Sequence, residues 1–296
     1  MMQRKKLLIT GASGYLGWHL GQAAQNAWDV YGLTGTKRVQ DPAIQNVRVD
    51  LTHEIALQAA LHQIQPDALI HAAALSRPNT CEVDPDLSFA VNVQAAWQIA
   101  DYCAERDIPC VFTSTDQVFD GQKAPYGETD PVAPINRYGE HKVLAEEGMR
   151  SRYPHTIICR LPLLYGLAPQ GKTFLQGFVS QLRAGEPLKA FTDEIRTPVS
   201  GQSAAQGILL ALSAHQPYLH LGGRERLSRY AFACMLADAL GLPANLIQPC
   251  HQADVPMAAP RPQDVSLDSA LAQSLGYKPL TVQADLGAML HQNLDD

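Results

Sequence analysis

A tyrosine and a lysine one helical turn apart are the residues of this chain whose types and spacing could do acid–base chemistry. Tyr138 and Lys142 lie in RYGEHKVLAEEGM (137–149), a predicted helix, so they share one face with about 5 to 6 Å between their Cβ atoms. A nearby ammonium favours the phenolate and lowers a tyrosine pKa that is otherwise about 10, which suits the phenol for proton donation. Thr115 ends a predicted buried strand (109–115), and its hydroxyl could hold a substrate oxygen beside the phenol. The alternative for this spacing is an ordinary solvated helix face, so the rest of the chain must supply the context.

The amino terminus has the features of a phosphate-binding loop. An apolar strand (7–10) is followed by Gly11, Gly14 and Gly17, and then by a predicted helix that runs to about Asn26. Glycines suit a tight turn, a close approach of the backbone to a pyrophosphate, and close packing of helix on strand, with the helix amino end facing the anion. The spacing is G-x-x-G-x-x-G and not the G-x-G-x-x-G of most dinucleotide dehydrogenases, so a purely structural turn is the alternative.

The end of the second predicted strand indicates which nicotinamide cofactor such a loop would hold. Rossmann folds that prefer NAD place an Asp or Glu there, about 20 residues after the glycines, to bind the ribose hydroxyls. This chain has VYGLTGTKRV (30–39), with Thr34 near that place and Lys37 and Arg38 just beyond it. A hydroxyl with two cations suits a 2′-phosphate and favours NADP(H), whereas a solvated basic loop is the alternative.

The order of the predicted elements is that of an α/β fold. Strand-like runs alternate with helical ones, which indicates βαβ units, a parallel sheet and a ligand at the carboxyl ends of the strands. We expect a Rossmann-type doubly wound parallel sheet with a smaller C-terminal substrate lobe. The NADP-binding domain is predicted over residues 1–165, and the chain is expected to return to this domain at about 197–217. Residues 166–296 are otherwise expected to form mainly the substrate-binding lobe. The strand-like runs are LLIT (7–10), DVYGL (29–33), VRVDL (47–51), DALIHAA (67–73), PCVFTST (109–115) and HTIICRLPLL (155–164).

Six ordered motifs together resemble the extended short-chain dehydrogenase/reductase family. They are TGASGYLG (10–17), Asp50–Leu51, HAAAL (71–75), Asn92, STDQVFDG (114–121) and Tyr138 to Lys142. The chain is most similar to the dTDP-4-dehydrorhamnose reductase group and to the related regulatory β subunit of methionine adenosyltransferase. The resemblance implies an NADP(H)-dependent oxidoreductase acting on a carbonyl or hydroxyl of a nucleotide-linked sugar. The alternative that it leaves open is a non-catalytic, NADP-binding regulatory subunit that contacts a partner enzyme.

The resemblance also implies roles for individual residues. Thr115, Tyr138 and Lys142 would be catalytic, with Lys142 also holding the cofactor ribose. Arg196 matches an arginine that faces a substrate phosphate in extended family members. Gln117 would contact the sugar, where both related groups have Tyr, so hydrogen bonding is kept while the ring and its acidic proton are lost.

The resemblance implies more residues for the cofactor site than for catalysis and substrate binding. Asp50 and Leu51 would flank the adenine, Ala72 to Ala74 would line the cofactor, and Asn92 would support a water path behind Lys142. Arg160, Leu161 and Pro162 would lie along the nicotinamide side. The full expected set is Gly11, Ser13, Gly14, Tyr15, Leu16, Gly17, Thr34, Lys37, Arg38, Asp50, Leu51, Ala72, Ala73, Ala74, Asn92, Tyr138, Lys142, Arg160 and Pro162.

Composition agrees with this class of protein. The chain has 296 residues, 46% of them hydrophobic and 18% charged, with a net charge of −6, which predicts no broad basic face for nucleic acid or anionic membrane. The six cysteines form no C-x-x-C motif and fall mostly in apolar stretches, which suggests reduced thiols in the cytoplasm. The histidines have no metal-ligand spacing, so no metal is expected. The expected partner is a small-molecule substrate, with a homodimer and a partner enzyme both left open.

A competing motif lies at residues 166–173. GLAPQGKT fits G-x-x-x-x-G-K-[ST], the phosphate-cradling P-loop of nucleotide triphosphatases. However, Pro169 removes one of the backbone N–H groups that such a loop uses, and no later predicted strand ends in the Asp that would hold Mg²⁺. The reductase interpretation explains the segment as the loop that leaves the sixth strand.

Overall fold

A seven-stranded parallel sheet forms the centre of the protein. The computed structural model describes residues 4–168 and 173–291. The strand order is β11-β6-β5-β4-β1-β2-β3, and all six neighbouring pairs are parallel. This order is that of a doubly wound sheet with its switch point between β1 and β4, which confirms the predicted Rossmann-type fold. The strands are β1 (Lys6–Thr10), β2 (Asp29–Thr34), β3 (Ile44–Arg48), β4 (Ala68–His71), β5 (Cys110–Thr115), β6 (Ile157–Leu161) and β11 (Tyr218–His220).

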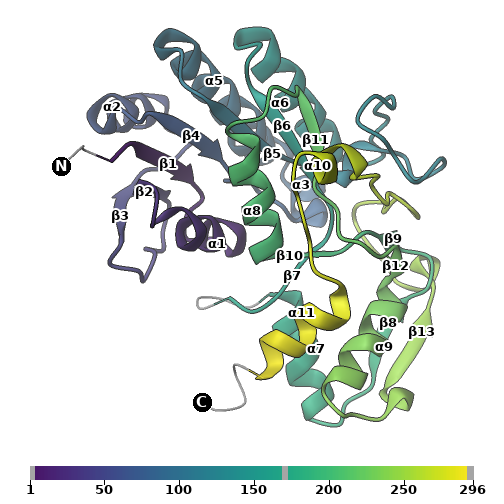
Figure 1. Cartoon of the computed structure of the whole chain (residues 1–296). Coiled ribbons are helices and arrows are strands. Elements are labelled where there is room, and N and C mark those ends of the chain that lie inside the picture. The colour runs from purple at the N-terminus through teal and green to yellow at the C-terminus, as the bar shows by residue number, and fades with distance from the viewer. Residues whose placement is uncertain (1–3, 169–172, 292–296) are drawn as a thin grey trace.

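Helices cover both faces of the sheet (Figure 1). Because both faces are covered, β4, β5 and β6 are buried along their whole length, and all six residues of β5 are buried. One apolar core lies under α1 and α8, and a second core joins the sheet to α2, α5 and α6. The bounds of these helices are α1 (Tyr15–Ala24), α2 (Glu54–Ile64), α5 (Ala95–Arg106), α6 (Arg137–Arg152) and α8 (Gly201–Ala211).

A third apolar core belongs to the later part of the chain, drawn at the lower right of Figure 1. Between its elements the chain returns to the sheet, because α8 packs on α1 and β11 joins the edge beside β6. The division into two domains stays a prediction. The elements of this part are α7 (Phe174–Arg183), β8 (Leu188–Phe191), α9 (Arg229–Ala239), β13 (Ile247–Cys250) and α11 (Val282–His291).

Short elements connect these layers. The strand pairs are β7 (Leu164–Tyr165) with β10 (Val199–Ser200), and β9 (Ile195–Arg196) with β12 (Leu227–Ser228). The remaining elements are α3 (Pro78–Val83), α4 (Pro85–Phe89), the π-helical turn η1 (Ala90–Gln94), the 3₁₀ turns η2 (Asp116–Val118), η3 (Ala244–Leu246) and η4 (Gln252–Asp254), and α10 (Ala270–Ser274).

Two strands differ from the sequence-based expectation. The third strand, expected at 47–51, is β3 at Ile44–Arg48, because Ile44 pairs with Val30 of β2 and is buried. The run expected at 155–164 is divided into β6 and β7, since Pro162 has no N–H for the ladder.

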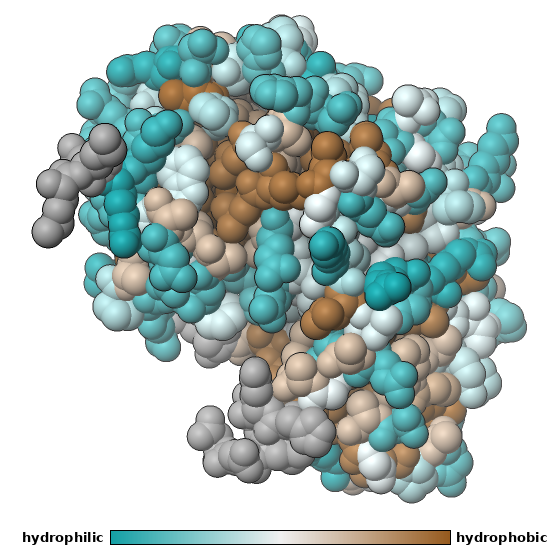
Figure 2. Space-filling view, viewed as in Figure 1, coloured by the Kyte–Doolittle hydropathy of each residue, from teal (hydrophilic) through white to brown (hydrophobic). Residues whose placement is uncertain are grey.

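Apolar side chains remain at the surface along α8. Leu209, Leu210 and Leu212 pack on the core beneath them but are only partly buried. Figure 2 shows a band of hydrophobic residues where Figure 1 places this helix. Within residues 4–168 and 173–291, no helix combines the length and the apolarity needed to cross a membrane.

Two glycines bring α1 close to the loop that follows β1. Gly11 has a φ of +68°, in the left-handed region that favours glycine. A Cβ on Gly17 would lie 2.2 Å from the carbonyl oxygen of Gly11, so any side chain there would push the helix away from the loop. This close contact fixes the start of α1 directly beside the carboxyl end of β1.

We predict that Gly17→Ala lowers the free energy of unfolding by about 1 to 3 kcal/mol, because the new methyl group overlaps backbone atoms. The matched control is Gly177→Ala in α7, where an added Cβ would have nothing within 4 Å. This control should be stabilising by up to about 1 kcal/mol, as alanine is the better helix former. Urea unfolding of both variants measures the difference, and equal effects would contradict the packing argument.

Candidate active site

A cleft of about 900 Å³ lies at the carboxyl ends of β1, β4, β5 and β6. Parallel strands bring their carboxyl ends to one edge of the sheet, so loops distant in sequence meet there. Most of the predicted site residues line this cleft. They are Gly11, Ser13, Gly14, Tyr15, Leu16, Gly17, Ala72, Ala73, Ala74, Thr115, Gln117, Tyr138, Lys142, Pro162 and Arg196.

The start of α1 forms the end of the cleft suited to an anion. Its N-cap residue, Gly14, makes no side-chain capping hydrogen bond, so the first-turn N–H groups are left for a ligand or water. Tyr15 also lines the cleft, but its hydroxyl donates to the Tyr165 carbonyl oxygen and accepts from the Gly201 N–H at 2.9 Å. The hydroxyl of Tyr15 therefore ties the loop to the later part of the chain.

Lys142 is buried beneath the cleft. Its side chain is among the largest fully buried ones, and Nζ donates to the Thr113 carbonyl oxygen at 2.7 Å. Nζ also lies 3.8 Å from the centroid of the Phe112 ring, a cation–π distance. Burial lowers the pKa of Lys142 to about 7, and Glu146 opposes this change. The ammonium thus titrates near neutral pH.

Tyr138 lies beside Thr115, as the sequence predicts, but its acidity differs from the prediction. Burial raises the pKa of Tyr138, the charge of Asp116 raises it further, and a hydrogen bond with Thr115 opposes the rise. The prediction that Lys142 lowers this pKa was wrong for the protein alone, because the ammonium hydrogen-bonds to the Thr113 carbonyl oxygen instead. Tyr138 is therefore a phenol across the physiological range, which is the form that a proton donor needs.

Asp116 and Arg196 form a buried charged pair beside Thr115. Thr115 Oγ1 donates to Asp116 Oδ1 at 3.2 Å, and Arg196 Nε lies 3.3 Å from Asp116 Oδ2. Burial raises the pKa of Asp116 to about 6, although Arg196 lowers it. The guanidinium of Arg196 is 5% exposed and also donates to the Ile195 and Pro262 carbonyl oxygens at 2.7 and 3.2 Å. Arg196 is therefore held by internal partners although it lines the cleft, and its contact with a substrate phosphate stays a prediction.

Sequence reasoning missed Arg261, which also lines the cleft. Its Nη2 donates to Asn79 Oδ1 at 3.1 Å, and its Nη1 has no hydrogen-bond partner among the described residues. It also missed Ser114, Asp116 and Glu194 as cleft residues. Ser114 and Asp116 flank Thr115, so the strand-end argument that selected Thr115 could have found them.

Gln117 lines the cleft through the η2 turn after β5. Its side-chain oxygen accepts from Asn136 Nδ2 at 3.1 Å, and Asn136 also caps α6 by accepting from the Gly139 N–H at 2.9 Å. The amide of Gln117 is thus anchored to the start of the helix that carries Tyr138.

Five predicted cofactor residues lie outside the lining of the cleft, at the end of β2 and in the segments that follow β2 and β3. Thr34 is buried, and its hydroxyl has no hydrogen-bond partner among the described residues. Lys37 and Arg38 are exposed in the loop that follows β2. Asp50 accepts from Thr52, and Leu51 packs against the sheet core; both follow β3.

Asn92 and Arg160 have internal roles that the sequence did not indicate. Asn92 is buried in the π-helical turn, where it accepts from the Leu75 N–H at 2.9 Å and donates to the Leu75 carbonyl oxygen at 3.1 Å. It thereby anchors the loop after β4, which lines the cleft. Arg160 does not line the cleft, because its side chain lies on the α6 side of the sheet, where it is paired with Glu146.

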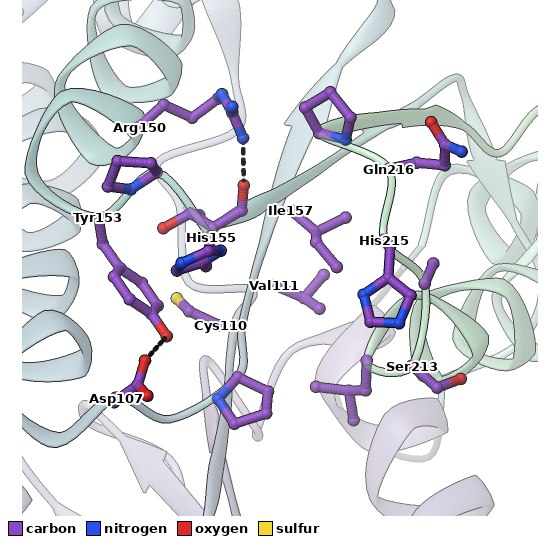
Figure 3. Close-up of a pocket in the computed structure, with 16 residues that line it drawn as sticks. Asp107, Cys110, Val111, Arg150, Tyr153, His155, Ile157, Ser213, His215 and Gln216 are labelled. Carbon is purple, nitrogen blue, oxygen red and sulfur yellow. Dashed lines mark hydrogen bonds between the residues drawn. The ribbon is translucent and has the colours of Figure 1, made fainter.

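A second depression, of about 390 Å³, lies at the amino ends of β5 and β6 (Figure 3). His155 and His215 lie on opposite sides of it, with Val111 and Ile157 between them. None of the predicted site residues belongs to it. Since ligands of doubly wound sheets bind at the carboxyl ends of the strands, the first cleft is the candidate active site.

Two other expectations concern phosphate loops and metals. Pro169 and three further residues of the P-loop-like segment, 170–172, lie outside the described residues. Among residues 4–168 and 173–291, no three His, Cys, Asp or Glu side chains are grouped so that they could hold a metal ion.

The fold and the cleft together define a Rossmann-type α/β protein whose polar side chains meet at the carboxyl ends of its strands. A family model described as the RmlD substrate binding domain matches residues 5–294. The chain belongs to this family, which confirms the resemblance to the dTDP-4-dehydrorhamnose reductase group.

Individual relatives cover nearly the whole chain. The probable low-salt glycan biosynthesis reductase Agl14 of Haloferax volcanii is 31% identical over 291 residues, covering 95% of this chain and 96% of that protein. The methionine adenosyltransferase 2 subunit beta of Pongo abelii is 29% identical over 281 residues, covering 92% and 83%. These two relatives differ in function, as their names say.

Solved structures show the same fold. A dTDP-4-dehydrorhamnose reductase from Bacillus anthracis, in complex with NADP, has a TM-score of 0.87 at 22% identity and covers 98% of this chain and 100% of that chain. A hypothetical dTDP-4-dehydrorhamnose reductase from Sulfolobus tokodaii has a TM-score of 0.82 at 29% identity, covering 94% and 98%.

We predict that Lys142→Met changes how stability depends on pH. The pKa of Lys142 is about 7 in the folded protein and about 10.4 in an unfolded chain, so the folded state binds fewer protons between these values. Lys142 therefore makes stability rise with pH over this range, by at most about 1.4 kcal/mol per pH unit. The variant should lose this rise. Urea unfolding between pH 6 and about 9.5 measures it, and parallel curves for wild type and variant would show that Lys142 is not perturbed.

Proposed function

We propose that this protein is an NADP(H)-dependent oxidoreductase of the extended short-chain dehydrogenase/reductase type, acting on a carbonyl or hydroxyl of a nucleotide-linked sugar. The observation that carries the proposal is the placement of Thr115 and Tyr138 in one cleft with the uncapped start of α1, with Lys142 beneath them. Agl14, which is 31% identical, is named a reductase, and the Sulfolobus tokodaii protein, 29% identical, is named a hypothetical dTDP-4-dehydrorhamnose reductase.

The residues of the cleft have distinct tasks in this reaction. A nicotinamide cofactor would supply or accept the hydride. Tyr138, as a neutral phenol, donates a proton to the substrate oxygen during reduction and takes it back during oxidation. Thr115 holds that oxygen through its hydroxyl, and Lys142 holds the cofactor ribose and stabilises the phenolate while it lasts. Gln117 contacts the sugar, and Arg261, with its free Nη1, contacts a substrate phosphate.

The residues present fit a phosphorylated dinucleotide. The start of α1 offers uncapped N–H groups to the pyrophosphate, and Gly17 lets this helix pack directly on the loop after β1. The orphan hydroxyl of Thr34, with the exposed Lys37 and Arg38 after the same strand, supports NADP(H) over NAD(H). The cysteines at 81, 103, 110, 159, 234 and 250 are free thiols, which supports the proposed location in the reducing cytoplasm.

We predict that Lys37→Ala combined with Arg38→Ala weakens NADPH binding and leaves NADH binding unchanged. Charge-assisted contacts to phosphate are about twice as strong as neutral ones, so each lost cation should cost about 1 to 2 kcal/mol. Titration calorimetry with both cofactors measures the effect, with Lys278→Ala, another exposed cation, as the control. Equal affinities of the wild type for NADPH and NADH would contradict the assignment.

A regulatory subunit is the second candidate function, because the methionine adenosyltransferase 2 beta subunits match 92% of this chain. Such a protein would keep the cofactor cleft and act by contacting a partner enzyme. The two candidates differ in whether the hydroxyl of Tyr138 is needed.

We predict that Tyr138→Phe abolishes most of the turnover while folding and cofactor binding change little, because the ring is kept and only general acid catalysis, worth about 10² to 10⁴-fold, is removed. NADPH consumption with a panel of keto-sugar nucleotides measures it. Tyr153→Phe is the matched control, since Tyr153 ends the same helix but does not line the cleft. Its hydroxyl donates to Asp107 Oδ1 at 3.1 Å.

A pull-down from cell extract distinguishes the second candidate. If wild type binds NADPH but consumes none, and a stoichiometric protein partner is recovered equally by wild type and Tyr138→Phe, the enzyme proposal fails and the regulatory function replaces it.

A further inference from the structure

Glu146 and Arg160 form a buried ion pair that joins α6 to β6. Arg160 Nε lies 3.1 Å from Glu146 Oε1, and Nη2 lies 2.8 Å from Oε2, a two-point contact. Both side chains are almost inaccessible, with exposed fractions of 4% for Arg160 and 3% for Glu146. Glu146 is one helical turn after Lys142, so the carboxylate lies on the helix face that carries the candidate catalytic lysine.

Among the described residues, Glu146 is the only carboxylate that forms an ion pair with Arg160. Two further carboxylates act on the neighbouring His220: Glu128 accepts from its backbone N–H at 3.0 Å, and the charge of Asp268 raises its pKa. Arg160 Nη1 lies 3.4 Å from Nε2 of His220, whose Nδ1 donates to the Tyr126 carbonyl oxygen at 3.0 Å. Burial and the neighbouring Arg160 lower the pKa of His220 to about 4, so this imidazole is neutral. Arg160 therefore has one carboxylate partner, and it fixes the position of Glu146.

Glu146 is also the carboxylate that acts on Lys142. Around the ammonium, β5 supplies the Thr113 carbonyl oxygen and the Phe112 ring, and α6 supplies Tyr138, which is a neutral phenol. From β4, His71 is neutral, because burial lowers its pKa to about 3.

The remaining neighbour is Cys81 of α3. Burial raises the pKa of its thiol, so it carries no charge at neutral pH. Burial favours the neutral amine of Lys142, and Glu146 is the largest influence that favours the ammonium.

We propose that Glu146, held by Arg160, is a positioning residue that favours the ammonium form of Lys142 beneath the cleft. The consequence for catalysis rests on the proposed function, because a neutral amine could neither hold the ribose as strongly nor stabilise the phenolate of Tyr138. The electrostatic effect itself concerns the protein alone. Arg160, which the sequence assigned to the nicotinamide side, acts from behind α6 instead.

The test is a pH titration of the cofactor-free protein with ¹³C-labelled lysine, followed by NMR. The Lys142 signal is identified by its loss in Lys142→Met. In wild type its midpoint should lie near 7. In Glu146→Gln the midpoint should fall by about one pH unit or more, since an opposite charge at this range has been removed. The matched control is Glu147→Gln, which removes the same charge from the next, exposed position and should leave the midpoint unchanged.

A second variant covers the case in which Glu146→Gln does not fold. Glu146→Gln combined with Arg160→Met leaves neither charge buried without its partner. Its midpoint should also fall, by less than in Glu146→Gln alone, because the loss of the Arg160 charge partly offsets the loss of the nearer carboxylate. An unchanged midpoint in the folded variants, with only their thermal stability lowered, would overturn the proposal and leave the pair a purely structural contact. The falling limb of the pH profile of NADPH consumption should move with the midpoint. If wild type consumes no NADPH, the proposed function fails, but the NMR midpoint still decides this inference.

Discussion

The burial of the Lys142 ammonium is the constraint on which the candidate site depends. A charged amine can be removed from water only where hydrogen bonds and opposite charge compensate for the lost hydration. Here the Thr113 carbonyl oxygen, the Phe112 ring and the carboxylate of Glu146 provide this compensation, and they come from β5 and α6. These contacts hold the helix against the strand, so Tyr138, one turn earlier, is brought beside Thr115.

The topology of the sheet creates the cleft above this ammonium. β1 and β4 are neighbours at the switch point, and their loops diverge to opposite sides of the sheet. The contact of Gly17 with the Gly11 backbone keeps the start of α1 within the cleft, while Asn92 anchors the loop after β4. The same edge thus offers N–H groups suited to an anion and a phenol suited to proton transfer. Neither group would be useful without the other, and only the parallel arrangement of the strands brings them together.

Much of the fold and part of the site could be predicted from local sequence patterns. Alternating apolar runs and helical segments predicted the doubly wound sheet, and strand ends predicted where Thr115, Tyr138 and the glycine loop meet. Properties that depend on burial or on distant partners could not be predicted this way. The pKa of Tyr138 is raised because the ring is buried, which its spacing from Lys142 does not reveal.

The arginines illustrate the same limit. Arg160 and Leu161 are adjacent in β6, yet successive side chains of a strand point to opposite faces, so Leu161 lines the cleft while Arg160 faces α6. Arg196 is held by carbonyl oxygens of Ile195 and Pro262, the latter 66 residues away. Arg261 reaches the cleft because it bonds to Asn79, 182 residues earlier, and no local pattern contains that contact.

We propose that this cleft binds NADPH with its nicotinamide beside Tyr138. A crystal structure of the NADPH complex is the most direct test. We expect the pyrophosphate at the start of α1, the 2′-phosphate near Thr34, Lys37 and Arg38, and Lys142 Nζ in contact with the ribose next to the nicotinamide. A cofactor bound elsewhere, for example in the depression between His155 and His215, or a nicotinamide ring directed away from Tyr138, would contradict it.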